Sequence, residues 1–245
     1  MGTKISIIAA SKNARDDLAS TVESLLKQTD TNFEFILIDG MSSDGTIDVL
    51  EEKANRFAHA PKIISELDKG IYDAYNKGLS IASGDYICYL GCGDKLLPDS
   101  IRLVKSFIAA TPDADVYYGI IKKYYENGGF TIYSSSPENL FNCSMIPHQA
   151  SFVKKDVYCK YGGFSMNYKI ASDFRVMLKL YLDKGKFVFI DRILAEFKMG
   201  GISTRNSDGY YECIQILKEN KCISQKEYIR KMIKKFFREI GKNLF

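Results

Sequence analysis

Short apolar runs alternate with segments of helical periodicity along the first half of the chain. Residues 4–10, 33–38, 62–65 and 86–90 are rich in β-branched and aromatic side chains, which is typical of buried strands. After each run apolar residues recur at spacings of three and four, which predicts helices, the last two at 71–82 and about 99–110. This alternation predicts an α/β fold with a doubly wound, mainly parallel sheet.

The pattern changes near residue 112. Strand-like segments there are not separated by full-length helices, and they occupy residues 115–124, 130–134, 149–154 and 186–198. Helical periodicity predicts further helices at 172–184, about 207–220 and about 224–240, with a loop at 200–203. We therefore expect one domain over 1–205, made of two halves at 1–111 and 112–205, followed by a helical extension at 206–245.

Composition places the chain among ordinary globular proteins, with 46% hydrophobic and 26% charged residues in 245. No run approaches the roughly 20 apolar residues of a transmembrane helix, and the first strand leaves no room for a signal peptide. The six cysteines are scattered, without a second pair at zinc-ligand spacing, and only two histidines occur. We expect reduced thiols and a cytoplasmic protein.

The positive charge is concentrated in residues 226–245, where seven Lys or Arg accompany two Glu, against a net charge of +4 for the whole chain. The nearly neutral remainder argues against general nucleic-acid binding. Apolar residues at spacings of three and four make this segment a basic amphipathic helix. The helix either docks on the body with a solvated basic face or attaches to an anionic membrane surface.

Three carboxylates follow three predicted strand ends: Asp39, Asp68 and Asp94, with Asp73 close behind. In a parallel sheet these ends share one edge, where ligands bind, and gathered carboxylates need a cation, protons or hydrogen-bond donors. A divalent metal bridging a nucleotide diphosphate would fit, although Asp94, after the turn that contains Gly91 and Gly93, could also be an ordinary turn residue. The motifs GxxxxGK[ST] and GxGxxG are absent, which speaks against a kinase-type NTPase and a dinucleotide dehydrogenase.

Asp173 lies at the start of a predicted helix. Spacing alone favours a capping role there, for Asp173 or for Ser172, over a general base in a cleft. His148, before a strand, is more often a structural histidine than a catalyst.

Several motifs together resemble the family 2 glycosyltransferases of bacterial surface-polysaccharide biosynthesis, which have the GT-A fold. The resemblance covers about 1–205, and it rests on KISIIAASKNA (4–14), SLLKQT (24–29), FEFILIDGMSSDGT (33–46), SELDKGIYDAYNKGLSIASGDYICYLGCGD (65–94), HQASFV (148–153), GGFSMNYKIASDF (162–174) and GGIS (200–203). As a set these motifs are specific, although no single one is.

The resemblance implies a role for each matching residue. Ala9 and Ser11 would line the nucleotide pocket, Asp39 would bind the base, and the ribose and donor sugar would contact Asp68, Lys69, Gly70 and Asp73. Asp94, beside Gly93 on the donor side, would hold Mg²⁺ or Mn²⁺, and Asp173 would be the general base. His148 and Gln149 would lie on the acceptor side. The family's metal motif usually carries two acidic residues, whereas Cys92 or Gly93 stands at the earlier position here.

The implied function is inverting, metal-assisted transfer from a nucleotide sugar, expected to be a UDP-sugar, to a hydroxyl of a glycan or polyprenyl-diphosphate-linked acceptor. The enzyme would be cytoplasmic, peripheral at the inner face of the membrane through 226–245. The incomplete metal motif keeps open a non-catalytic nucleotide-sugar-binding or scaffold protein. A nucleotidyltransferase would need a Gly- and Arg/Lys-rich first loop, which SKNARDD matches poorly.

Overall fold

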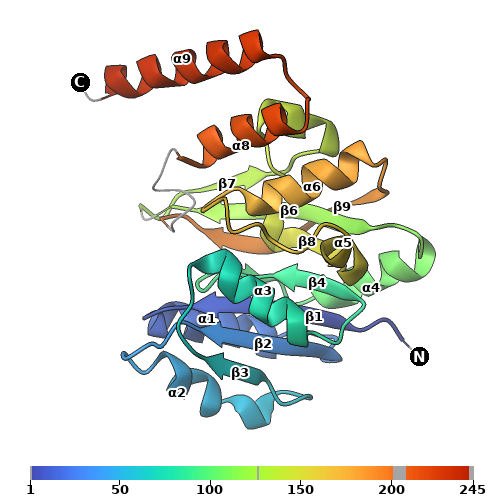
Figure 1. Cartoon of the computed structure of the whole chain (residues 1–245). Coiled ribbons are helices and arrows are strands. Elements are labelled where there is room, and N and C mark those ends of the chain that lie inside the picture. The colour runs from blue at the N-terminus through green and yellow to red at the C-terminus, as the bar shows by residue number, and fades with distance from the viewer. Residues whose placement is uncertain (1, 126, 201–207, 243–245) are drawn as a thin grey trace.

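One mixed sheet runs through the computed structural model, which describes residues 2–125, 127–200 and 208–242 (Figure 1). Its nine strands within those residues are β1 (Ile5–Ser11), β2 (Phe33–Asp39), β3 (Lys62–Ser65), β4 (Tyr86–Tyr89), β5 (Lys95–Leu96), β6 (Val116–Tyr124), β7 (Phe130–Tyr133), β8 (Ser151–Lys154) and β9 (Phe187–Lys198). The strand order is β3-β2-β1-β4-β8-β6-β9-β5, with β7 paired to β6.

The first four strands are parallel, as the sequence predicted. β1 pairs in parallel with both β2 and β4, and β2 pairs in parallel with β3. β8 is antiparallel to both β4 and β6, so β6 points the same way as β4, and β9 is parallel to β6. The sheet is therefore mainly parallel, and its strand order reverses direction between β1 and β4.

Helices cover both faces of the sheet, because successive strand residues point to opposite sides. One core contains Ile8 and residues of α3 (Ile71–Ile81), α5 (Lys155–Lys160), α6 (Ser172–Leu182) and α8 (Asp208–Glu219). The other contains Ile7 and residues of α1 (Arg15–Leu26), α2 (Thr46–Glu51) and α4 (Ser100–Ala110). This two-sided arrangement confirms the predicted doubly wound fold.

Helix α3 lies unusually close to the sheet at Gly78. A Cβ on Gly78 would lie 2.5 Å from Cγ2 of Ile8 on β1, so no larger residue fits without a shift. This close approach fixes the height of α3 above the sheet, and α3 carries Tyr72 and Asp73 in its first turn.

The differences from the predicted elements are local. Helix α5, the two-residue strand β5 and the 3₁₀ turns η2 (Pro137–Asn142) and η3 (His148–Ala150) were not predicted. The second predicted helix, expected to include Ala54 and Phe57, ends at Glu51 and is followed by the 3₁₀ turn η1 (Ala54–Arg56). The strand predicted from 149 begins at Ser151, because η3 occupies the residues before it. Residues 201–203 of the GGIS motif, and the boundary near 205, lie outside the described residues, so the domain division stays a prediction.

The last helix, α9 (Gln225–Lys242), lies at the end of the molecule opposite β3 (Figure 1). Tyr228 and Met232 pack against the core, whereas Ile229 and Ile233 are 47% and 50% exposed. Among the helices of the described residues, none has both the length and the apolar character that crossing a membrane requires.

A buried glutamate joins the strands at the edge of the sheet opposite the predicted site. Glu34 on β2 accepts hydrogen bonds from the Ser6 hydroxyl and from both the backbone N–H (2.9 Å) and the hydroxyl (2.8 Å) of Ser83. Lys62 Nζ lies 2.7 Å from the same carboxylate. Burial raises the pKa of Glu34, but the bonds from Lys62, Ser6 and Ser83 outweigh it and lower the pKa to about 2.

Replacing Glu34 by Gln should lower the free energy of unfolding by about 2 kcal/mol, because a charged acceptor of several buried bonds is lost. In the native protein the pKa of Glu34 is depressed, so its contribution is complete above the unfolded-state pKa of about 4.3 and is lost as pH falls toward about 2. Urea unfolding at pH 7 and pH 3 measures both effects. An equal loss at the two pH values would contradict this role.

Candidate active site

The carboxyl ends of β1, β2 and β4 meet where the strand order changes direction. In open α/β sheets this switch point is where ligands bind. Ser11 ends β1, Asp39 ends β2 and is its register partner, and the loop Gly91–Asp94 follows β4. The fold therefore brings the predicted donor residues to one edge.

Asp39 is completely buried and organises this edge. Its carboxylate accepts bonds from the hydroxyls of Ser11 (2.7 Å), Ser42 (2.5 Å) and Ser65 (2.9 Å), and from the backbone N–H of Ser42 (2.8 Å). Burial raises the pKa of Asp39, but these bonds outweigh it, so the pKa lies below its usual value. The carboxylate thus ties together the ends of β1, β2 and β3.

The loop between β3 and α3 is folded onto this edge. Asp68 Oδ1 accepts the Gly70 N–H at 2.8 Å, and Asp68 Oδ2 lies only 2.5 Å from where a Cβ on Gly40 would be. Asp73 accepts the Lys69 N–H at 3.0 Å. Gly40 is therefore needed for Asp68 to lie beside the end of β2.

Asp94 is held in the turn after β4. The Thr21 hydroxyl of α1 donates to the Asp94 carbonyl (2.8 Å) and accepts the N–H of Gly93 (2.9 Å), whose φ of 95° favours glycine. Asp94 Oδ1 accepts the Lys198 N–H at 2.9 Å, and the Gln149 side chain also donates to this carboxylate. Burial raises the pKa of Asp94 to about 7, against these two bonds.

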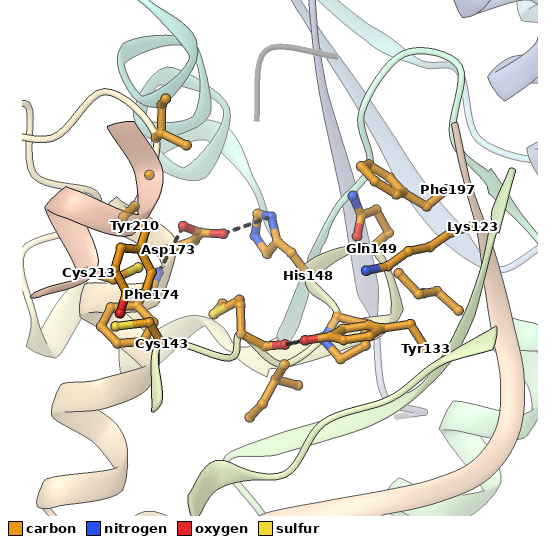
Figure 2. A pocket seen from close by; sticks show the side chains of 17 residues that line it. Lys123, Tyr133, Cys143, His148, Gln149, Asp173, Phe174, Phe197, Tyr210 and Cys213 are labelled. Atoms are coloured by element: carbon orange, nitrogen blue, oxygen red, sulfur yellow. Dashed lines mark hydrogen bonds and ion pairs between the residues drawn. The ribbon is translucent and has the colours of Figure 1, made fainter. Parts of the chain in front are cut away.

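Asp173 lies in the first turn of α6, but it is not the cap. The N-cap is Ala171, which makes no side-chain bond, and the Ser172 hydroxyl accepts the Ser165 N–H instead. Asp173 Oδ1 accepts bonds from the Tyr72 hydroxyl (2.9 Å) and the Phe174 N–H (2.8 Å). Its Oδ2 lies 3.8 Å from Nδ1 of His148, the contact that Figure 2 marks with a dashed line. Capping is therefore not what places Asp173 here.

Asp94 and Asp173, which are far apart in the sequence, line the same cavity of about 290 Å³. Tyr72, His148 and Gln149 line it between them. His148 is packed against the ring of Tyr89, with centroids 5.5 Å apart, and burial lowers its pKa. A neutral histidine and two acids thus face one space, with the carboxylates able to serve as metal ligand and proton acceptor.

A second cavity, of about 360 Å³, is also lined by Asp173 (Figure 2). Asp173, His148 and Gln149 line both cavities, so the two spaces adjoin each other at these side chains. The cavity residues are mainly apolar, but Lys123 points into it from β6.

The donor set at Asp94 fits a cation only together with a ligand. No group of three or more His, Cys, Asp or Glu at metal-binding spacing occurs among the described residues. Cys92 donates its thiol to the Ala10 carbonyl, and burial raises its pKa to about 12, so it offers no thiolate at neutral pH. Mg²⁺ is commonly bound by one or two carboxylates plus substrate phosphates, and a cation would favour the charged form of buried Asp94.

Comparison with known proteins identifies the family. The profile of Glycosyl transferase family 2 matches residues 6–171, which include Asp94, and Asp173 lies two residues beyond the match. The chain belongs to this glycosyltransferase family.

Relatives of this glycosyltransferase confirm the match. It is 31% identical to an uncharacterized glycosyltransferase of Mycobacterium tuberculosis over 205 residues, 82% of this chain and 77% of that protein. It is 27% identical to a PGL/p-HBAD biosynthesis glycosyltransferase of the same species over 205 residues, 81% of this chain and 78% of the relative.

Solved structures share the fold of the glycosyltransferase. TarS 1–349 of S. aureus in complex with UDP-GlcNAc superposes with a TM-score of 0.73 at 19% identity, covering 87% of this chain and 65% of TarS 1–349. The mannosyltransferase PcManGT of Pyrobaculum calidifontis, with GDP-Man and Mn²⁺, gives 0.67 at 14% identity, covering 92% and 66%. The chain thus spans less than two thirds of these fragments, and at such identities the likeness concerns the fold alone.

Not every predicted site residue of the glycosyltransferase faces the shared cavity. The side chain of Ala9 is fully buried in the core beneath α1, and its neighbour Ala10 lines the cavity, because strand residues alternate. Asp39 and Ser11 lie behind the edge, bonded to each other. Asp68, Lys69, Gly70 and Asp73 form the adjoining loop and are not among the cavity residues.

Two side chains that position Asp173 in the glycosyltransferase had no sequence signal. Tyr72 reaches it from α3, and the pKa of that phenol is raised by burial and by the charge of Asp173. Glu212 of α8 accepts the N–H groups of Lys169, Ile170 and Ala171 at 2.8–2.9 Å, which fixes the segment that leads into α6. Both contacts join segments that are distant in the sequence.

Proposed function

We propose that the protein is an inverting glycosyltransferase that moves a sugar from a nucleotide-sugar donor, a UDP-sugar, to a hydroxyl of a glycan or lipid-linked acceptor. The observation that carries this proposal is the cavity shared by Asp94 and Asp173 at the carboxyl edge of the sheet. The family match supports sugar transfer, and the UDP-GlcNAc complex of TarS supports the class of donor.

The nucleotide would bind along the ends of β1 and β2. Ala10 would face it from β1, and the loop containing Asp68, Lys69 and Gly70 would close over the ribose and sugar. Asp39 is buried behind Ser11 and Ser42. It would affect binding of the base indirectly, because its carboxylate holds these two serines in place. The diphosphate would then lie toward Gly93 and Asp94.

Asp94 would hold Mg²⁺ or Mn²⁺ together with the donor diphosphate. When bound, such an ion offsets the negative charge that grows on the departing diphosphate. The Lys198 N–H and the Gln149 amide keep the Asp94 carboxylate in place for that purpose. PcManGT, which shares this fold, contains Mn²⁺ together with GDP-Man, which supports a cation beside the donor.

Asp173 would be the general base. Its Oδ1 accepts bonds from Tyr72 and Phe174, its Oδ2 lies near His148, and the residue lines both cavities. An acceptor hydroxyl in the second cavity could give its proton to Asp173 while attacking the anomeric carbon of a donor sugar in the first. Attack from the side opposite the leaving diphosphate inverts the anomeric configuration.

A non-catalytic nucleotide-sugar-binding protein is the alternative. One observation favours it: Cys92 or Gly93 stands where the family's metal motif usually has a second acidic residue. Such a protein would bind donor without transferring or hydrolysing it.

The helix α9 would bring the enzyme to an anionic membrane surface. Ile229 and Ile233 are exposed beside Arg230 and Lys234, which gives a face of apolar and basic side chains on an otherwise docked helix. Such a face binds anionic lipid headgroups through apolar burial and charge together. A peripheral position would suit a lipid-linked acceptor.

Replacing Asp173 by Asn should lower the rate of sugar transfer by about 10²–10⁴-fold, because the proton acceptor is lost. UDP-, GDP- and dTDP-sugars with Mn²⁺ would first be screened by thermal shift to find the donor, since a ligand of the native state raises the melting temperature. The variant should keep the donor's thermal shift unchanged.

Asp183→Asn is the matched control, since Asp183 follows α6 and pairs with Lys160 at the surface. It should transfer sugar at the wild-type rate. Near wild-type transfer by Asp173→Asn would refute the assignment of the base, and donor binding without any turnover by the wild type would establish the binding protein instead.

Replacing Ile229 and Ile233 by Glu should reduce sedimentation with vesicles containing 30% phosphatidylglycerol by about tenfold or more, because apolar contact is removed and like charge is added. Neutral phosphatidylcholine vesicles should bind both proteins weakly. The control Ile132→Glu changes a similarly exposed isoleucine, on β7. Equal sedimentation of the double variant and the wild type would exclude this surface.

A further inference from the structure

The second cavity contains one lysine that the proposed mechanism does not use. Lys123 is the single lysine or arginine among the described residues that line this space, whose walls are mainly apolar. Figure 2 shows its ammonium group directed into the cavity, with Asp173 on the facing wall. A cation and the proposed base thus border one space.

Lys123 is held in this position by an aromatic ring. Its Nζ lies 3.5 Å from the ring centroid of Tyr133, which is across from β6 on the neighbouring strand β7. The Tyr133 hydroxyl donates to the Met145 carbonyl at 2.7 Å, so the ring itself is fixed. These contacts therefore keep the ammonium group inside the cavity.

Within the described part of the chain, no carboxylate lies in salt-bridge distance of Lys123, in contrast with Lys77, Lys105 and Lys198. An ammonium has three N–H donors, and the ring face of Tyr133 interacts with the ammonium from one side only, which leaves N–H donors for another partner. Burial lowers the pKa of Lys123, which is the consequence expected when no acid compensates the lost hydration. An anion in the cavity would supply the missing partner.

We propose that the second cavity binds an acceptor that carries an anionic group, a phosphate or a carboxylate, which pairs with Lys123. The apolar part of the acceptor would contact Tyr133, Phe197 and Tyr210, and its reacting hydroxyl would face Asp173. This inference rests on the proposed function, and it adds the chemical class of the acceptor.

Two sources would provide such a group. One is the phosphate of a lipid-linked sugar, and the other is the carboxylate of an acidic sugar. Both form charge-assisted hydrogen bonds with an ammonium, so Lys123 alone does not separate them.

Equilibrium binding of three small probes tests the proposal without any turnover. Phenyl phosphate, phenylacetate and benzyl alcohol share an aromatic group and differ in charge, and calorimetry with UDP present keeps the donor side filled. Wild-type protein should bind at least one anionic probe about tenfold or more tighter than benzyl alcohol. The tighter anion, phosphate or carboxylate, indicates the source.

Lys123→Met keeps the aliphatic stem but removes the charge, so it should abolish the preference for the anionic probes, and Lys123→Arg should restore it. The matched control is Lys122→Met, because Lys122 lies over the rings of Tyr124 and Phe130 and does not line the cavity. Lys122→Met should bind all three probes like the wild type. An unchanged preference in Lys123→Met, or equal binding of charged and neutral probes by the wild type, would overturn the proposal.

The two proposals fail in different ways. Charge-dependent probe binding by a protein that turns over no donor would overturn the transferase function and leave the anion site in place. Sugar transfer by a wild-type protein without any charge preference for the probes would overturn only the anionic acceptor.

Discussion

The structure depends on the pairing of strand β8 with β4 and β6, which joins the two halves of the sheet. β8 lies antiparallel between β4 and β6, so the strand that ends at the Asp94 turn is linked through one short strand to the region before α6. The residues that precede β8 are His148 and Gln149, and both line the cavities between the two acids. The β4–β8 ladder thus places these two residues near the Asp94 turn, whereas the Tyr72 hydroxyl of α3 holds the proposed base.

Around that ladder, buried polar groups fix the two sides of the site independently. On the donor side, Asp39 collects bonds from three serines at the ends of β1–β3, and Thr21 holds the turn before Asp94. On the acceptor side, Glu212 of α8 holds the segment before α6, and Tyr72 of α3 holds Asp173. The two sides meet at the cavity residues and also through the β4–β8 pairing and the bonds of Asn76 with Phe164, which is consistent with a donor and an acceptor that react at a common boundary.

Much of the fold was predictable, because the spacing of apolar residues indicates which side of a strand or helix is buried. β1–β4 and the helices α3, α4 and α6 have the predicted identity and nearly the predicted ends. Strand β5 was missed because its two residues, Lys95–Leu96, are too few to show an alternation of apolar and polar residues. The turn η3 was missed because His148–Ala150 leads directly into strand β8, and the two were predicted as one strand. The antiparallel insertion of β8 has no local signature, since pairing partners are chosen by tertiary packing.

For the site, strand ends predicted which acids gather at one edge, but not which of them face open space. Asp39 is fully enclosed, and the side chain of Ala9 points into the core whereas that of Ala10 reaches the cavity. Tyr72 and Glu212 were not predicted, because their contacts join segments separated by tens of residues. Lys123 was not predicted because the cavity that it lines is formed by tertiary packing. Family resemblance, and not spacing, suggested the role of Asp173 as base over that of a helix cap.

The most direct test of the central claim is a crystal structure of the protein with UDP and Mn²⁺, with the ion located by its anomalous scattering. Our account predicts that Asp94 and the diphosphate bind Mn²⁺ directly. The β-phosphate, to which the sugar of the donor would be attached, should face the cavity that Asp173 lines. A diphosphate bound away from Asp94, or a nucleotide on a surface that does not adjoin Asp173, would contradict it.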